Sequence, residues 1–351
     1  MSHEYNYHDL PALKEFYKQN PLHTCIQNNK FSASGTYDFF VNLAYKSEDI
    51  GRCISLMINV VNLSMLEKFD ESNFLLYRDK INNGELITSI CNNEAFNHGS
   101  NLNGMISYIK KNDDGSYDIN LNKRIITNVG AADLLFVSVP IWGEQENKFA
   151  ILLFEGSEIP QMSLSDKLSG LTSCPTGSII TELKNYKNVR LVSNVRKSLF
   201  VMRHMYNMER FLLGCIMTGI LKKILKYALD EKDNDVLGKF NNQYLQDKII
   251  KIFDSFVRLE SLMINCIHYM NTQTPVESIL SVIKLACIND VHDAIMLLKE
   301  ICGGKSYFKD HISSKFLADH EAINHLGGTR ELMKQTLYQE LQSKKTRSLY
   351  V

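Results

Sequence analysis

The spacing of apolar residues changes twice along this chain of 351 residues, and this change limits the possible folds more than any other feature. In residues 1–84, apolar side chains such as Ile50 and Ile54 recur every three or four positions, which is the helical spacing. Residues 85–192 instead hold short apolar runs separated by turn residues, as strands do. The helical spacing returns in residues 193–351. The sequence therefore predicts an α+β protein with an N-terminal helical domain, a central β-domain and a C-terminal helical domain.

The central region carries two signals for paired strands. Residues 105–109 and 117–119 flank the sequence DDG at 113–115, which favours a tight turn between two strands. Two further apolar runs, 134–142 and 149–154, are separated by a short polar segment. This pattern predicts an antiparallel β-domain.

The C-terminal region predicts four long amphipathic helices. The first carries a stripe of apolar pairs from Phe211 to Leu229 at helical spacing. The others are expected over 249–270, 276–301 and 322–342. Helices of this length, joined by short connections, are typical of an antiparallel four-helix bundle.

Composition excludes several kinds of partner. Acidic and basic residues balance at 39 each, so the chain lacks the positive charge typical of nucleic-acid-binding proteins. The eight cysteines form no C-x-x-C pair and the ten histidines show no H-E-x-x-H spacing, so we expect neither a disulfide framework nor a metal site.

Residues 1–10 are polar and do not resemble a signal peptide, and no apolar run reaches the length of a membrane span. These features predict a cytoplasmic protein without a membrane span.

Six short segments carry more specific information. They are residues 94–101 (EAFNHGSN), similar to T-E-P-x-x-G-S-D; 123–128 (KRIITN) with AD at 132–133, similar to K-x-W-I-T-N with a trailing A-D; 170–176 (GLTSCPT), similar to G-x-R-S-S-P-T; 207–210 (NMER); 300–304 (EICGG), similar to Q-x-x-G-G; and 310–329, similar to a stretch from D-Y-P to E-G-T. Each segment alone is a weak signal, but six in one order are strong. The chain resembles the acyl-CoA dehydrogenase family, and the resemblance thins before residue 84, where the helical region is shorter than usual.

The resemblance implies FAD, bound between the β-domain and the bundle, with hydrogen-bond donors beside the flavin ring. Thr127 matches the family threonine that bonds near flavin N5, and Asn93 stands where a threonine usually reaches N1 and O2. Ser100 matches the serine that meets the pyrophosphate. Ile125 replaces the usual tryptophan beside the flavin and would keep an apolar wall there.

Further cofactor-binding residues are implied in the C-terminal region. Glu300 opens the segment similar to Q-x-x-G-G, and Thr329 ends the segment similar to E-G-T. Gly303 and Gly304 would let the backbone approach a dinucleotide closely. In the family this loop usually meets the FAD of a neighbouring subunit, so the resemblance implies a homodimer or homotetramer. Without the resemblance, the two glycines are equally well explained as an ordinary helix C-cap.

The resemblance also implies a catalytic base. Family members remove a proton from Cα of an acyl thioester with a glutamate while a hydride leaves Cβ for flavin N5. Gly327 occupies the most frequent position of that glutamate. Long-chain and isovaleryl-type members also lack it there and carry the base on the first bundle helix, immediately before an arginine, where this chain has Glu209 and Arg210. Glu209 is therefore the expected base, Arg210 a positioning residue, and the Gly327 N–H a donor to the thioester carbonyl, although a Glu-Arg pair alone is more often a solvated helix end.

The function implied by the resemblance is FAD-dependent α,β-dehydrogenation of an acyl thioester. The acyl group would be carried by CoA or by an acyl carrier protein, and the electrons would pass to an electron-transfer flavoprotein. The alternative is a homologue that kept the fold, lost efficient catalysis and acts as a binding or structural protein. Three departures from the family pattern favour this alternative: Asn93, Ile125 and Asn234, the last of which replaces an arginine on the FAD phosphates.

Overall fold

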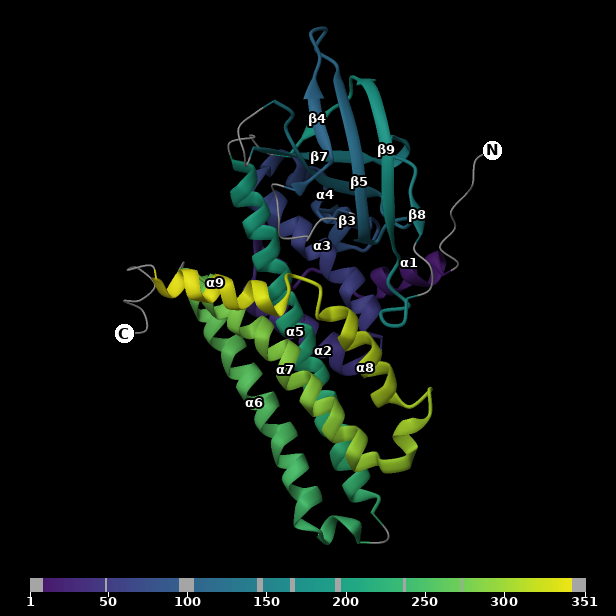
Figure 1. The fold of residues 1–351 in the computed structure, drawn as a ribbon, viewed down its shortest axis with the longest axis vertical. Coiled ribbons are helices and arrows are strands. Elements are labelled where there is room, and N and C mark those ends of the chain that lie inside the picture. Colours follow the sequence, from purple (N-terminus) through teal and green to yellow (C-terminus); the bar gives the residue numbers. More distant parts are fainter. Residues whose placement is uncertain are drawn as a thin grey trace. The chain divides into compact units, whose positions relative to one another are not determined.

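The computed structural model describes residues 9–47, 49–94, 104–143, 148–164, 168–192, 197–235, 238–272 and 274–342. The element order is N-terminal helices, strands and C-terminal helices, which confirms the predicted α+β class (Figure 1). The chain divides into two compact units. The first comprises Met1–Phe31, Ile54–Leu168 and Thr172–Tyr206, and the second comprises Ser32–Cys53, Ser169–Leu171 and Asn207–Val351.

The N-terminal region is mainly helical, as its apolar spacing predicted. Its elements are α1 (Leu10–Gln19), the short strands β1 (Ile26–Gln27) and β2 (Lys30–Phe31), α2 (Ala33–Lys46), α3 (Ile50–Phe69) and α4 (Glu71–Asn82). Two of these helices begin at a side chain that accepts a hydrogen bond from an otherwise unsatisfied backbone N–H. Ser32 accepts from the N–H of Gly35 at the start of α2, and Asp70 accepts from the N–H of Asn73 at the start of α4.

Helix α3 departs from the expectation that no apolar run reaches the length of a membrane span. Among the helices that the structure describes, α3 alone is long and apolar enough to cross a membrane. However, 89% of its most apolar stretch is buried inside the protein. Its polar side chains are also used internally, because Asn59 donates to the carbonyl oxygen of Leu86 and Asn62 donates to the hydroxyl of Thr88. These contacts are typical of a core helix.

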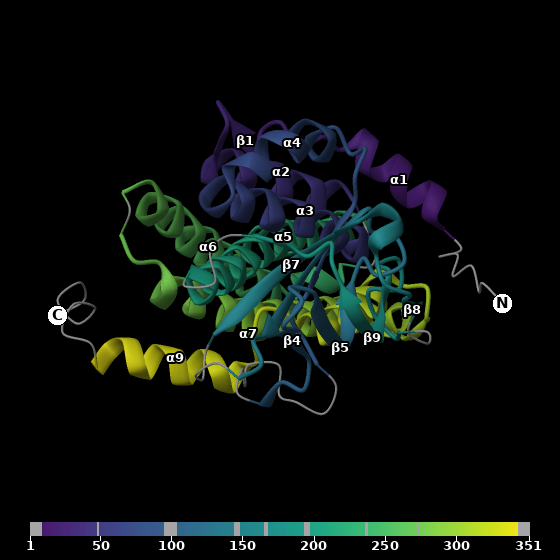
Figure 2. The same ribbon diagram turned by 90° about the horizontal axis from the view of Figure 1, so that it is seen from above.

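The β-domain consists of two four-stranded sheets. One has the order β10-β7-β6-β3, and the other has the order β4-β5-β9-β8, of which β4, β5 and β9 lie side by side in Figure 2. The strands are β3 (Thr88–Cys91), β4 (Tyr108–Lys111), β5 (Tyr117–Thr127), β6 (Leu134–Pro140), β7 (Phe149–Glu155), β8 (Ser163–Leu164), β9 (Thr176–Tyr186) and β10 (Arg190–Leu191). The predicted turn at 113–115 joins β4 to β5, with Gly115 at φ +84°.

One strand pair differs from the predicted antiparallel domain. Strands β3 and β6 pair in parallel, with Thr88 opposite Leu134. Parallel neighbours require a long connection, and here that connection runs through the β4–β5 hairpin of the other sheet. Apolar side chains from both sheets, including Leu121, Ile126 and Val137, form one buried cluster.

The C-terminal region is helical, as predicted, with one difference at its end. Its α-helices are α5 (Ser198–Asp233), α6 (Gln243–Asn271), α7 (Glu277–Cys302), α8 (Ile312–Ile323) and α9 (Arg330–Gln342). Helix α7 packs against α6, α8 and α9, and α5 approaches α6 and α7 at Gly214 (Figure 1). The single helix predicted over 322–342 is wrong, because Gly327 and Gly328 adopt φ values of +67° and +105° and separate α8 from α9.

All eight cysteines are buried and none forms a disulfide. Burial raises the pKa of the Cys91 and Cys287 thiols to about 12, so both are neutral at physiological pH. The cysteines are therefore small core residues, as the sequence predicted.

Candidate active site

The predicted site residues lie in both compact units. Asn93, Ile125 and Thr127 belong to the first unit, and Glu209, Arg210, Glu300, Gly303, Gly304, Gly327 and Thr329 belong to the second. Ser100 lies outside the described residues.

The second unit brings Glu209, Arg210 and Gly327 together. Glu209 and Arg210 are consecutive residues of α5, and Gly327 lies in the turn between α8 and α9. The Arg210 Nε donates a hydrogen bond of 2.9 Å to the carbonyl oxygen of Gly327. A Cβ atom placed on Gly327 would lie 3.8 Å from Cγ of Glu209 and 3.4 Å from Cγ of Arg210. A side chain at position 327 would therefore start beside the stem of the Glu209 carboxylate.

The backbone at this turn favours glycine. The φ of +67° at Gly327 falls in the left-handed region, which other residues rarely adopt. A Cβ at Gly327 would also lie 3.3 Å from Cδ1 of Leu213, and one at Gly328 would lie 2.8 Å from Cε of Met333. The first carbon of a side chain at 327 would thus be in contact with side chains of α5, most tightly with Leu213.

The surroundings of Glu209 change its acidity. Burial raises the pKa of the Glu209 carboxyl above its ordinary value, and this effect exceeds the opposing effects of the Lys284 charge, the Arg210 charge and a backbone hydrogen bond from Gly327. A carboxylate with a raised pKa is a stronger base at neutral pH than an exposed one. Arg210 is only 8% exposed, so its charge acts in a partly desolvated site.

Sequence reasoning missed Lys284, a lysine of α7 that is fully buried. Its Nζ donates a hydrogen bond of 2.7 Å to the carbonyl oxygen of Ile323, at the end of α8. Burial lowers the pKa of Lys284 to about 8. The available signal was its position between Leu280 and Cys287 on the apolar face of the helix, where a lysine is unusual.

In the first unit, Ile125 lies in a β-bulge of β5. The pairing of β5 with β9 shifts register between Lys123 and Ile126, and Ile125 has φ +56° and is 67% exposed. A β-branched residue at positive φ is strained, and such strain is concentrated at functional sites. The bulge therefore presents an apolar side chain at the surface where the resemblance expects the wall of the flavin site.

Asn93 and Thr127 are available to a ligand. Asn93 is exposed and Thr127 is half-buried. Within the described part of the chain, neither the Asn93 amide nor the Thr127 hydroxyl makes a hydrogen bond, although the carbonyl of each residue accepts one. Both side chains can donate, which is the property that a reduced flavin ring requires of its neighbours.

A buried ion pair fixes the backbone next to these residues, and sequence reasoning did not identify it. Lys123 Nζ lies 2.9 Å from Oε1 of Glu94, and both side chains are fully buried. Glu94 also accepts from the N–H groups of Ile106 and Ser107. The pair ties the segment after β3 to β5, two residues before Ile125.

The C-terminal residues assigned to the cofactor make contacts of their own. Glu300 pairs with Lys248 of α6, and the Thr329 hydroxyl accepts a 3.3 Å hydrogen bond from the N–H of Leu332 at the start of α9. Gly303 and Gly304 are exposed, and no atom lies within 4 Å of a Cβ placed on either. The two glycines therefore leave open space beside the backbone.

Position 234, where the resemblance expects an arginine on the FAD phosphates, carries no charge. Asn234 is exposed, and its amide donates a 2.8 Å hydrogen bond to the carbonyl oxygen of Asp230 at the end of α5. Asn234 thus caps a helix, and this position lacks the cation that the resemblance expects on the FAD phosphates.

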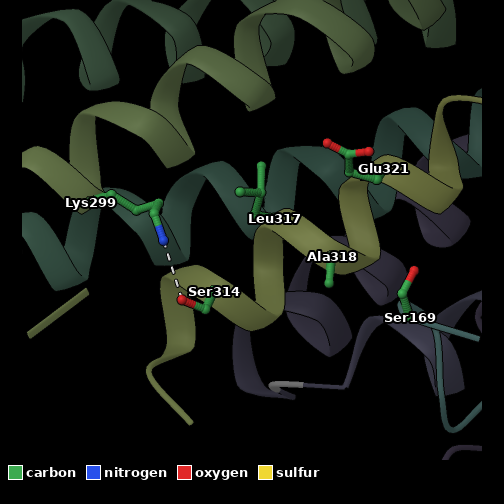
Figure 3. A pocket seen from close by; sticks show the side chains of 6 residues that line it. All are labelled: Ser169, Lys299, Ser314, Leu317, Ala318 and Glu321. Carbon is green, nitrogen blue, oxygen red and sulfur yellow. Dashed lines mark hydrogen bonds between the residues drawn. The ribbon is translucent and has the colours of Figure 1, made fainter. Parts of the chain in front are cut away.

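A separate pocket of about 290 Å³ lies beside α8 in the second unit (Figure 3). It is lined by Ser169, Lys299, Ser314, Leu317, Ala318 and Glu321. Lys299 donates to the Ser314 hydroxyl and to the carbonyl oxygen of Ser306, so its charge is already engaged. None of the predicted site residues lines this pocket. Over the residues that the structure describes, no three His, Cys, Asp or Glu side chains are grouped to hold a metal ion.

Residues 199–342 match the family model described as acyl-CoA dehydrogenase, C-terminal domain. A comparison with curated proteins gave no match. Solved structures give extensive matches at low sequence identity. An FAD complex of PigA has a TM-score of 0.84 at 17% identity, covering 95% of this chain and 89% of that chain.

Two further structures match equally well. Butyryl-CoA dehydrogenase from Megasphaera elsdenii has a TM-score of 0.83 at 17% identity, covering 95% of this chain and 90% of that chain. The prolyl acyl carrier protein oxidase AnaB has a TM-score of 0.85 at 15% identity, covering 95% of this chain and 91% of that chain. The chain therefore has the acyl-CoA dehydrogenase fold, and its residues 199–342 match the C-terminal domain of that family.

Proposed function

We propose that this protein belongs to the acyl-CoA dehydrogenase family and is an FAD-dependent oxidoreductase that removes hydrogen from Cα and Cβ of an acyl thioester. Glu209 is the base, in the placement of the long-chain and isovaleryl-type members. The observation that carries the proposal is that Glu209 lies beside Gly327: a Cβ placed on the glycine would lie 3.8 Å from Cγ of Glu209. The side chains of a glutamate on α5 and of a glutamate at position 327 would thus lie beside each other, so either could supply the carboxylate.

The residues present fit a flavin ring in part. The exposed Ile125 offers an apolar surface, and the Thr127 hydroxyl and the Asn93 amide are donors without a partner in the described chain. Ser100 is expected at the FAD pyrophosphate, and Gly303 and Gly304 are expected to meet the FAD of a neighbouring subunit. Bound FAD would supply the acceptor for the hydride that leaves Cβ.

Glu209 would take the proton from Cα, and the electrons of that C–H bond would form the new double bond. Its raised pKa suits this step, because the base must be ionised before the reaction and protonated after it. Arg210 holds the Gly327 carbonyl and so orients the N–H of the same turn. That N–H meets the Glu209 carboxyl in the structure. We expect it to turn to the thioester carbonyl when substrate binds, which would stabilise the negative charge that develops there.

The acyl group would be carried by CoA or by an acyl carrier protein. Proteins of the same fold include butyryl-CoA dehydrogenase and the prolyl acyl carrier protein oxidase AnaB, so the fold supports both carriers. An electron-transfer flavoprotein is the expected acceptor for a dehydrogenase of this family, and the cytoplasm is the expected compartment. We also propose a homodimer or homotetramer, since α6 presents an exposed apolar stripe.

The test is flavin bleaching by a panel of acyl-CoA and acyl-carrier-protein thioesters under anaerobic conditions. Glu209→Gln should bind FAD and lose at least about 100-fold in the rate of bleaching, because a positioned base contributes a factor of this size. Glu331→Gln, which removes an exposed carboxylate of α9, should bleach at the wild-type rate. Wild-type rates in Glu209→Gln would exclude Glu209 as the base.

A second candidate function is a binding or structural protein that kept the fold without efficient catalysis. The observation that favours it is the helix-capping contact of Asn234, which leaves its position without a cation for the FAD phosphates. A protein that is purified colourless and does not become yellow with added FAD would support this function. A yellow protein that bleaches with a thioester would support the enzyme.

A further inference from the structure

The second unit contains a buried lysine without a carboxylate partner. Lys284 of α7 is fully buried, and its ammonium makes its hydrogen bond to the Ile323 carbonyl oxygen, at 2.7 Å. No described carboxylate lies within ion-pair distance of it. Burying a cation is costly unless its charge is used, so a lysine in this setting needs a physical reason.

The carbonyl that Lys284 contacts leads directly to the Gly327 turn. Carbonyls at the end of a helix carry partial negative charge, which a cation stabilises, and the Ile323 carbonyl also accepts from the N–H of Leu326 at 3.1 Å. From Ile323 the chain runs four residues to Gly327, whose own carbonyl accepts from Arg210. Two cations from two different helices, α7 and α5, thus hold the two ends of one turn.

The titratable groups whose charge acts on Lys284, or on which its charge acts, come from three helices. Glu209 and Arg210 lie on α5, Cys287 lies on α7 itself, and His320 lies on α8. Burial keeps Cys287 neutral and lowers the pKa of His320 below its ordinary value. Of these groups, Glu209 is therefore the one whose ionised form is an anion that the Lys284 cation can stabilise, and that charge acts to lower the pKa of Glu209.

We propose that Lys284 is a positioning residue of the active site: it fixes the end of α8 beside the Gly327 turn, and its charge keeps the neighbouring base, Glu209, ionised. This inference rests on the proposed function of Glu209. It gives a reason for burying this lysine, which neither the packing of α7 nor the resemblance to the family explains. The lysine acts through Glu209 and through the Gly327 turn, and takes no part in the transfer of the proton or of the hydride.

The experiment is a double-mutant cycle in urea unfolding, on the full chain at pH 7, with Lys284→Met, Glu209→Gln and the double variant. The shift in unfolding midpoint caused by Lys284→Met should be smaller in the Glu209→Gln background, because the carboxylate that the lysine stabilises is then absent. Lys248→Met is the matched control, since Lys248 is a buried lysine of α6 paired with Glu300. Its shift should be the same in both backgrounds. Equal shifts for Lys284→Met in both backgrounds would overturn the inference.

A pH profile separates the charge from simple packing. The acid limb of kcat/KM reports the pKa of the base in the free enzyme. This limb should move to higher pH in Lys284→Met and in Lys284→Gln, the second of which keeps a hydrogen-bond donor but no charge. In Lys284→Arg, which keeps the charge, the limb should lie at its wild-type pH. If Lys284→Met does not fold, Lys284→Gln replaces it in the cycle. An acid limb that stays in place in Lys284→Gln would contradict the proposed role of the charge.

The two proposals fail in different ways. Coupling in the urea cycle without bleaching by any thioester would leave Lys284 linked to Glu209 and would exclude the proposed dehydrogenase. Bleaching that depends on Glu209, without coupling, would keep the dehydrogenase and exclude the role of Lys284.

Discussion

At the scale of single residues, the site depends on one glycine and one glutamate that lie beside each other. Gly327 is needed for its backbone, at φ +67°, and its missing side chain leaves room for α5. Glu209 reaches that room from the helix, with Arg210 fixed on the glycine carbonyl. A carboxylate at either position would therefore arrive beside the same turn.

Glu209 should make the stability of the protein depend on pH. Its pKa in the folded protein is raised above the ordinary 4.5, so the folded state holds this proton more tightly than the unfolded chain does. The stability that this group contributes is complete below pH 4.5 and is lost as pH rises through the raised folded pKa. Relative to wild type, Glu209→Gln should therefore gain unfolding free energy as pH rises from 4.5 to 8. Urea unfolding of both proteins across this range measures the difference, and a constant difference would contradict it.

Gly327→Ala should destabilise the protein by about 1–2 kcal/mol, because alanine is strained at positive φ. Its methyl group would also press on Leu213, at 3.3 Å. Gly304→Ala is the control, since its φ is not in the left-handed region and no atom lies within 4 Å of the added carbon. Urea midpoints of the two variants, measured without added cofactor, should differ clearly. Equal midpoints would show that the turn relaxes.

At the scale of elements, strand β5 combines rigidity with a local irregularity. The buried Lys123–Glu94 pair fixes the strand on one side of the bulge, and pairing with β9 resumes at Ile126. Between them Ile125 is turned outward, although alternation alone would make it one more strand residue. The bulge thus depends on neighbours that are firmly held.

Lys123→Met should cost about 3–5 kcal/mol of unfolding free energy, because it leaves the Glu94 carboxylate buried and without its cation. The double variant Lys123→Met/Glu94→Gln should recover part of this loss. Lys184→Met is the control on β9, where the pair with Glu182 is exposed, and it should change stability little. Chemical denaturation of the four proteins measures these differences. A double variant no more stable than Lys123→Met would mean that the Glu94 charge is not the cause.

At the scale of the whole molecule, the fold persists at identities of 15–17%, so few positions in the sequence are needed to specify it. What a single chain leaves uncovered is also informative. Helix α6 exposes large apolar side chains on one face at helical spacing, which is unusual for a monomer. They are Ile250, Phe253, Val257 and Ile264.

Phe253→Glu should reduce association of the protein with itself, because it places a charge in the middle of this stripe. Sedimentation velocity at micromolar concentration should show a larger species for wild type and a smaller one for the variant. Lys334→Glu, an exposed change on α9, should sediment as wild type does. A wild-type protein that sediments as a monomer would remove the proposed oligomer.

The sequence by itself determined the order of helical and β regions, because the period of apolar residues is set locally by the backbone. It also supplied the Glu209–Arg210 pair and Gly327, through similarity to known motifs. It could not reveal the parallel pairing of β3 with β6 or the groups that surround Lys284, although a lysine on the apolar face of its helix was a local signal. Each of these depends on what lies across from a residue in space. A lysine becomes a buried cation, and a glycine becomes the neighbour of a carboxylate, only when helices distant in the sequence pack together.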